Sequence, residues 1–463
     1  MMTDLFTDAS HPPPATSRET RVLSAGETYT SVTDNITSIV LTEPSPWSWW
    51  IGLALSGSLL ALFLYATVYL IATGIGIWGT NIPAGWAFPI TNFVWWVGIG
   101  HAGTLISAFL LLAKQDWRTS INRFAEAMTI FAVMCAGMFP LLHLGRPWLF
   151  YWLAPYPNTM LLWPQFRSPL IWDFFAVLTY FTVSLLFWYA GLIPDLASLR
   201  DRAGTWGGRV AYGILAMGWR GSSKHWQRYH TMYLLLAGLA APLVISVHSI
   251  VSTDFAMAIV PGWHSTVFPP YFVAGAILSG FAMVITLAIP LRWMYGLHDY
   301  VKIAHLSNSA KLMLVTGTIV GYAYAMEAFM AYYGDNPYER YLAGNRVFGS
   351  YNWAYFTILI ANALVPQLYW FRAVRENVWA LFFTALVIQY GMWLERFVII
   401  VPSLHRDYLP SAWHMYYPTF WDFAHLFGSI GFFFFAFLLF LRFLPMISIF
   451  ELREMVHDTS KDH

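Results

Sequence analysis

The chain has 463 residues, of which 58% are hydrophobic and only 11% are charged, and its net charge at pH 7 is +1. Soluble globular domains carry about 25% charged residues, so this composition excludes an ordinary soluble domain. The near-neutral charge and the lack of a basic domain give no support for nucleic-acid binding.

Ten apolar runs follow a polar N-terminal segment, and each is long enough to cross a hydrocarbon core of about 30 Å as a helix. In lipid a helix satisfies its own backbone hydrogen bonds, so the sequence predicts an all-α polytopic membrane protein with ten transmembrane helices. Helices 6–9 run in the same directions as helices 2–5, which is compatible with two parallel repeats. The runs lie at 47–71, 91–114, 125–145, 170–191, 229–252, 268–291, 306–331, 352–371, 378–400 and 420–444.

The distribution of lysine and arginine predicts the orientation. If the N-terminus is cytoplasmic, 19 of the 25 basic residues fall on the cytoplasmic side, as the positive-inside rule requires. Both termini are therefore expected in the cytoplasm, with residues 1–46 a flexible tail and 446–463 a second tail. Helices 1–5 occupy 47–252 and helices 6–10 occupy 253–445. The long basic loop at 192–228 has an apolar stretch that suits the membrane surface.

Cysteine and histidine counts limit the cofactors that this chain can hold. Cys135 is the only cysteine, whereas an iron–sulfur cluster needs about four ligands. A b-type haem needs two axial histidines at similar depth on facing helices, and only His143 and His248 come near that condition. We therefore expect no haem and no iron–sulfur cluster in this chain. Redox centres for electron transfer would belong to other subunits.

Polar side chains that converge at the outer ends of helices 3, 4 and 5 form the candidate site. His143 and Asp173 are expected at similar depth on sequential helices, with His248 and Asp254 near the same face. A histidine and carboxylates at the edge of an apolar cavity suit a quinol, because they can accept its two hydroxyl protons. An equally weighted alternative is a His–Asp pair that only ties helices together.

A second set of polar residues lies in helices 6–9 and in helix 2. Glu327 has no cation nearby in the sequence, so we expect a protonated or water-linked carboxyl group there. Glu395 and Arg396 are either part of a polar path or a plain interfacial ion pair. His101, among small residues that favour close helix packing, is either a proton-relay group or a histidine bonded to a backbone carbonyl, and the second is favoured. Glu327, Glu395 and His101 together form a candidate proton path.

Several segments resemble the integral membrane subunits of the NrfD/polysulphide-reductase family. The general motifs are 98–108 (GIGHAGTLISA), 142–148 (LHLGRPW) and 168–173 (SPLIWD). Two further segments, 118–123 (RTSINR) and 191–195 (GLIPD), resemble the ActC-type subunit of bacterial alternative complex III. The resemblance extends from about residue 45 to about residue 445.

This resemblance implies two four-helix bundles, formed by helices 2–5 and 6–9, plus two flanking helices. It implies a quinol-oxidising subunit in the bacterial cytoplasmic membrane, with quinone or menaquinone as the redox partner molecule. The site residues that it implies are His143 and Asp173, then Asp254 and Arg396. The implied partners are a periplasmic iron–sulfur subunit, multihaem cytochrome c subunits, a sister NrfD-like subunit, small membrane subunits and lipids. Three alternatives stay open: the membrane subunit of a polysulphide or other acceptor reductase, a secondary transporter, and a purely structural anchor.

Overall fold

A computed structural model describes residues 28–153 and 168–461 of the chain. Within these ranges every regular element is helical and no strand occurs. Nine helices in the same part of the chain are long and apolar enough to cross a membrane. The prediction of an all-α polytopic membrane protein is therefore confirmed.

The nine helices coincide with nine of the ten apolar runs. Long apolar stretches form helices here because a helix leaves no backbone polar group unpaired in lipid. The second span is interrupted near its end by a π-turn. The spans are α2 (Trp47–Thr73), α3 (Phe88–Thr104) with the π-turn Leu105–Phe109 and α4 (Leu110–Leu112), α5 (Asn122–His143), α6 (Pro169–Arg202), α8 (Ser223–Ala256), α9 (Phe268–Met294), α10 (Ile303–Tyr333), α14 (Val378–Leu404) and α15 (Phe420–Phe443).

The run at 352–371 differs from the other nine, so the prediction of a tenth regular helix is wrong there. It runs alongside α10 and α14 as three short pieces: α12 (Asn352–Ile358), a π-turn (Leu359–Leu364) and a 3₁₀ turn (Val365–Trp370). Pro366 has no backbone N–H and cannot donate to the carbonyl of Asn362, so the regular hydrogen-bond ladder stops at this point. Asn362 itself is fully buried within the π-turn.

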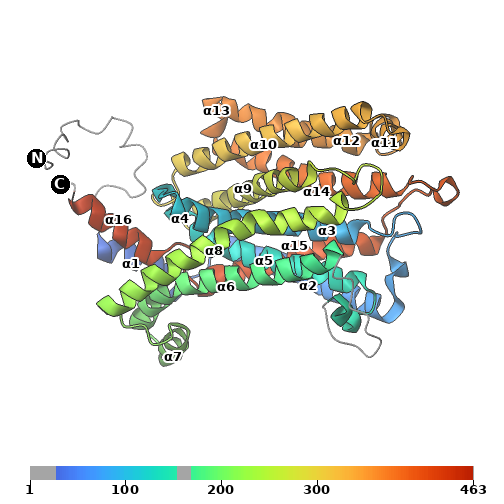
Figure 1. Ribbon diagram of the computed structural model, residues 1–463. Coiled ribbons are helices and arrows are strands. Elements are labelled where there is room, and N and C mark those ends of the chain that lie inside the picture. The colour runs from blue at the N-terminus through green and yellow to red at the C-terminus, as the bar shows by residue number, and fades with distance from the viewer. Residues whose placement is uncertain (1–27, 154–167, 462–463) are drawn as a thin grey trace, which may run out of the picture.

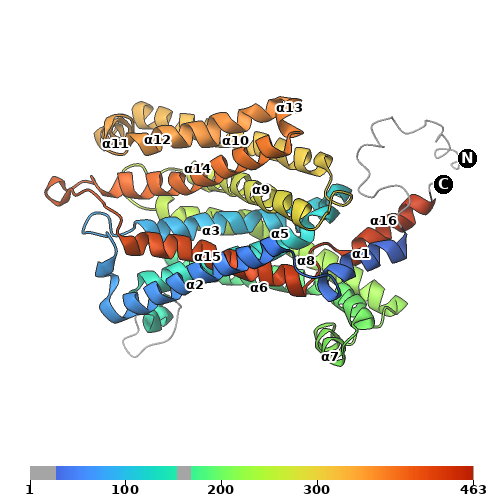
Figure 2. The same ribbon diagram turned by 180° about the vertical axis from the view of Figure 1, so that it is seen from behind.

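Two groups of four packed segments form the centre of the protein. The first bundle consists of α3, α5, α6 and α8, and the second of α9, α10, α14 and the segment 352–370. The helices α3 and α9 pack against each other across the junction, and both are 83% buried, compared with 17% for α2. The core therefore lies along this junction. The two remaining spans, α2 and α15, pack along each other, and α15 contacts α5 on the outside of the first bundle (Figures 1 and 2).

Small residues allow α3 to approach its neighbours closely. A Cβ atom at Gly103 would lie 2.0 Å from the carbonyl oxygen of Ala125 on α5. A Cβ atom at Gly280 on α9 would lie 2.1 Å from the Cβ of Ala102. Since only glycine fits at such distances, the expected close packing through segment 98–104 is confirmed.

The helices α1 and α16 lie side by side at one end of the molecule (Figure 1), called the terminal end below; the opposite end is called the far end. The first of them, α1 (Tyr29–Leu41), begins with a capping box between Thr28 and Ser31 and has a buried face. The expectation of a flexible tail is therefore wrong for residues 29–41, while residues 1–27 lie outside the described ranges. The expected C-terminal tail likewise contains α16 (Ile449–Lys461).

Shorter elements connect the spans. In the basic loop, Trp206 and Ile214 of α7 are 80% and 72% exposed, which suits the predicted helix at a membrane surface. The same loop begins later than expected, because α6 continues well past residue 191. The short elements are α7 (Trp206–Leu215), α11 (Pro337–Phe348), α13 (Arg372–Arg375) and the 3₁₀ turns Ile75–Ile77, Asp116–Ser120, Pro147–Leu153 and Pro410–Ala412.

Candidate functional site

A pair of carboxyl groups lies at the far end of the first bundle. Asp173 comes from the start of α6 and Asp254 from the end of α8, and these antiparallel helices pack along their length. The two side chains are within hydrogen-bonding reach of each other. Asp173 is buried, and neither of its carboxyl oxygens has a donor among the described residues. Two facing carboxyl groups can hydrogen-bond only if one of them carries a proton, so the pair holds a shared proton site.

His143 lies at the same end but has different neighbours from those expected. It is the last residue of α5, and its ring stacks on Trp78 with ring centroids 6.3 Å apart. Its Nδ1 is buried without a hydrogen-bond partner among the described residues. No hydrogen bond or ion pair joins His143 to Asp173 in this part of the chain, so the tie between helices that formed the alternative interpretation is absent there. Both groups remain available to a bound molecule.

His248 lies deeper in the bundle than the sequence suggested. It precedes Asp254 by six residues on a helix that continues to Ala256, which places it about 9 Å further from the far end. Its ring meets the ring of His101 on α3, with centroids 4.8 Å apart. The expected match in depth between His248 and His143 is therefore wrong, and the two histidines that face each other are His101 and His248. Both nitrogens of His248 are buried without partners among the described residues.

The surroundings of His101 fit the interpretation that was favoured for it. Its Nδ1 is bonded to the backbone carbonyl of Val97, one turn earlier on α3. A carbonyl accepts only from a protonated nitrogen, so Nδ1 carries the proton and Nε2 is left as an acceptor. The ring also stacks on Tyr180, with centroids 5.0 Å apart. Tyr180 in turn donates to the carbonyl of Gly100 at 2.9 Å.

The second bundle contains a buried polar cluster around Glu395 and Arg396. Their side chains form an ion pair at 2.7 Å and are at most 2% exposed. The angle is too poor for a hydrogen bond between the paired atoms, so the contact is mainly Coulombic. Glu395 also accepts hydrogen bonds from Tyr324 and, at 3.3 Å, from Asn362. Asn362 is the residue that the π-turn carries, and π-turns often mark functional sites.

Arg396 also connects the two bundles. Its guanidinium lies over the ring of Phe272 on α9, 4.2 Å from the centroid. The opposite neighbour of that ring is His248, with centroids 5.7 Å apart. Arg396 is thus two contacts away from the histidine pair, and it does not contact the carboxyl pair at the far end. Its expected place in a quinol site with Asp173 is untested by these contacts.

Glu327 has a cation partner, contrary to the expectation from the sequence. Its carboxylate forms an ion pair with Arg346 on α11, and the two side chains are 21% and 7% exposed. No local pattern indicated this pair, because Arg346 lies in a polar connection that folds back on α10. The interpretation of Glu327 as a lone protonated carboxyl group is therefore corrected.

A charged cluster at the terminal end was missed entirely. Arg123 is fully buried and pairs with Glu126 and with Asp195 on α6, both at 3.1 Å. Nearby, Arg118 pairs with Glu451 of α16, also at 3.1 Å. One signal was present in the sequence, since an arginine and a glutamate three residues apart at the start of an apolar run lie on the same helical face. Asp195 was hidden because the end of α6 was placed too early.

Metal ligands do not gather in the part of the chain that the structure describes. No group of three or more histidine, cysteine, aspartate or glutamate side chains is placed to hold a metal ion there. Cys135 is buried, and its only contact of hydrogen-bond type is with the carbonyl of Ser429 at 3.5 Å. The chemistry that these residues can perform is therefore proton transfer and hydrogen bonding to a bound molecule.

Comparison with known proteins identifies the family. The chain is 28% identical over 170 residues to a protein of Halobacterium salinarum described as a "Putative dimethyl sulfoxide reductase membrane subunit". That match covers 36% of this chain and 34% of the relative, so the chain spans about a third of the length of this relative. Residues 76–406, which contain both bundles, match the family described as polysulphide reductase, NrfD. The chain is a member of the NrfD polysulphide reductase family of membrane proteins.

Proposed function

We propose that this chain is the quinol-oxidising membrane subunit of a multi-subunit oxidoreductase of the alternative complex III type. The observation that carries the proposal is the carboxyl pair of Asp173 and Asp254, at the same end of the bundle as His143. Oxidation of a quinol releases two protons and two electrons. The ionised member of the pair accepts one hydroxyl proton, and the neutral imidazole of His143 accepts a hydrogen bond from the other hydroxyl and takes its proton.

The electrons must leave this chain, because Cys135 is its only cysteine and an iron–sulfur cluster needs about four. We propose that they pass to an iron–sulfur subunit docked at the far end and then to multihaem cytochrome c subunits. A sister NrfD-like subunit, small membrane subunits and lipids complete the proposed surroundings. The excess of lysine and arginine in the connections at the terminal end supports a cytoplasmic location for that end. The far end then faces the periplasm of a bacterial cytoplasmic membrane.

A proton path through the bundles is the less developed part of the proposal. His101 and His248 offer three buried ring nitrogens without protein partners among the described residues. Glu395 lies in the neighbouring bundle, and Arg396 approaches the histidine pair through Phe272. We therefore keep His101 and Glu395 as candidate proton carriers. Glu327 is not proposed for this role, because Arg346 compensates its charge.

A second candidate function is supported by the description of the Halobacterium relative as a reductase membrane subunit. In that case the same site would bind a quinol, and the electrons would go to a reductase partner that acts on polysulphide or another acceptor. A transporter is a third possibility, and it would move a solute across liposomes that contain this chain alone. Electron delivery from quinol to added cytochrome c, measured on the purified complex, separates the first function from the other two.

The experiment that tests the quinol site uses the assembled complex. Quinol oxidation is measured for the parent protein and for His143→Ala and Asp173→Asn. Each substitution is expected to lower turnover at least tenfold, which corresponds to about 1.4 kcal/mol in the activation barrier. Parental turnover in both assembled variants would show that the carboxyl pair and the histidine are structural.

A further inference from the structure

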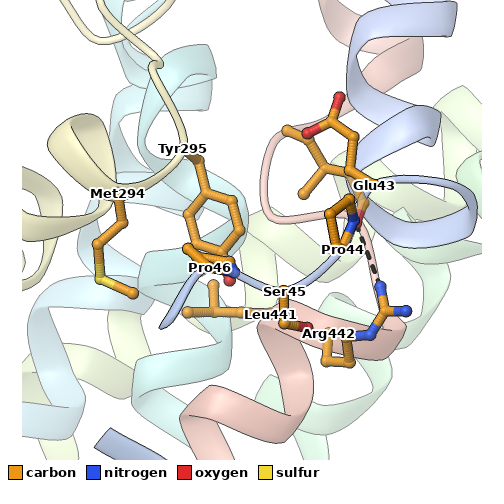
Figure 3. A pocket seen from close by; sticks show the side chains of 9 residues that line it. Glu43, Pro44, Ser45, Pro46, Met294, Tyr295, Leu441 and Arg442 are labelled. Atoms are coloured by element: carbon orange, nitrogen blue, oxygen red, sulfur yellow. Dashed lines mark hydrogen bonds between the residues drawn. The ribbon is translucent and has the colours of Figure 1, made fainter. Parts of the chain in front are cut away.

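A small pocket opens at the terminal end, away from the carboxyl pair. It has a volume of about 140 Å³ and lies where the linker between α1 and α2 meets the last turns of α9 and α15. A single water needs only about 10–15 Å³, so the pocket has room for a larger polar group. Figure 3 shows Glu43 and Ser45 on the linker, Tyr295 after α9, and Arg442 near the end of α15.

Exposed tryptophans place this pocket at the depth of lipid headgroups. Trp47 directly follows the linker and is 78% exposed, and Trp293 precedes the pocket residue Met294 and is 75% exposed. Tryptophan is enriched at the boundary between hydrocarbon and water. Below the pocket, α2 presents an apolar surface that is only 17% buried. A phospholipid can therefore place its headgroup in the pocket and its acyl chains along α2.

The charges in the pocket have opposite signs and are not paired with each other. Arg442 donates from Nη1 to the carbonyl oxygens of Ile39 and Val40, at 3.4 and 3.0 Å. Its Nε and Nη2 have no partner among the described residues. One carboxylate oxygen of Glu43 accepts from Ser38 at 2.6 Å, and the other has no such donor. No ion pair joins Glu43 to Arg442 within the described residues.

We infer that this pocket binds the headgroup of a zwitterionic phospholipid with a primary ammonium group, phosphatidylethanolamine. The guanidinium of Arg442 is a strong donor to phosphate oxygens. The carboxylate of Glu43 accepts hydrogen bonds from the ammonium group that the same headgroup carries two carbons further on. An anionic lipid would meet Arg442 equally well but would be repelled by Glu43. A lipid with a quaternary ammonium group would offer Glu43 no N–H donor.

The test uses the full-length protein in nanodiscs of three compositions, containing phosphatidylethanolamine, phosphatidylcholine or phosphatidylglycerol. Bound lipid is counted by native mass spectrometry after release from the nanodiscs. We expect the parent protein to retain phosphatidylethanolamine at least tenfold more often than the other two lipids. Glu43→Lys is expected to transfer the preference to phosphatidylglycerol. Arg442→Gln is expected to abolish retention of all three.

Control variants separate lipid binding from folding. Arg372→Gln replaces an exposed arginine on α13 that forms an ion pair with Glu376, and it should leave retention unchanged. Arg442→Gln also removes a cap from α1 and can weaken the fold, whereas Glu43 is exposed, so Glu43→Lys gives the decisive comparison. Equal retention of the three lipids by the parent, or a preference that Glu43→Lys does not change, would overturn the inference. Because quinol turnover is not measured, the outcome is independent of the proposed function.

Discussion

The carboxyl pair at the far end allows a prediction in which the number of carboxyl groups sets the size of the effect. With Asp173→Asn or Asp254→Asn, one carboxylate remains in place and can still accept a proton. Each single variant should therefore lose about tenfold in quinol turnover, or about 1.4 kcal/mol. The double variant removes both acceptors and should lose roughly 10²–10⁴-fold, the range that general base catalysis contributes.

The assay is quinol-dependent reduction of the partner cytochromes by the assembled complex, with the presence of every subunit verified by gel. Infrared difference spectra add a readout that is independent of activity. A pair that shares a proton titrates in two separate steps, and either single variant should show one step only. Asp335→Asn is the control, because Asp335 is exposed and pairs with Arg340 outside the bundles. Parental turnover in a fully assembled double variant would refute the role of the pair in proton acceptance.

Three further predictions concern stability. Arg123→Ala leaves two buried carboxylates without their cation and should cost about 3–5 kcal/mol, which thermal unfolding in detergent would detect; an unchanged melting temperature would contradict it. Glu327→Gln should lower stability without changing quinol turnover, and adding Arg346→Gln should restore part of the loss, whereas a selective loss of turnover would argue for a catalytic role. Burial lowers the pKa of His405 below its usual value of 6.5, so the unfolded chain binds more protons in acid. Stability should therefore fall as the pH drops below about 6.5, and His405→Asn should remove that dependence, with no flattening counting against it.

The membrane spans could be predicted from the sequence because the hydrophobic requirement for crossing lipid is strong and local. The run at 352–371 satisfied the same requirement but is not a regular helix. Its composition is apolar, yet Pro366 and the buried Asn362 alter the backbone hydrogen bonding. Hydropathy does not report such interruptions, since it counts apolar side chains and ignores which backbone groups are paired.

The site was predicted in part. Asp173 and Asp254 meet as their positions at the ends of antiparallel helices suggested. His248 was assigned to the wrong depth because the end of α8 was placed too early, and a few residues correspond to several ångströms along a helix. The pairing of Glu327 with Arg346 depends on how α11 folds back, which no local pattern encodes. Helix ends and long-range contacts were thus the main sources of error.

The position of α16 has a consequence for biosynthesis. Arg123 bonds to Ser448, which follows it by 325 residues in the chain, and Arg118 waits equally long for Glu451. At about 5–20 residues per second, the ribosome needs on the order of 15–65 s to supply these partners. During that interval the nascent protein holds an unfinished ionic cluster in an inserted bundle. Completion of the C-terminal helix therefore acts as a late checkpoint, and a ribosome that stalls before residue 448 would leave a species recognisable to membrane quality-control proteases.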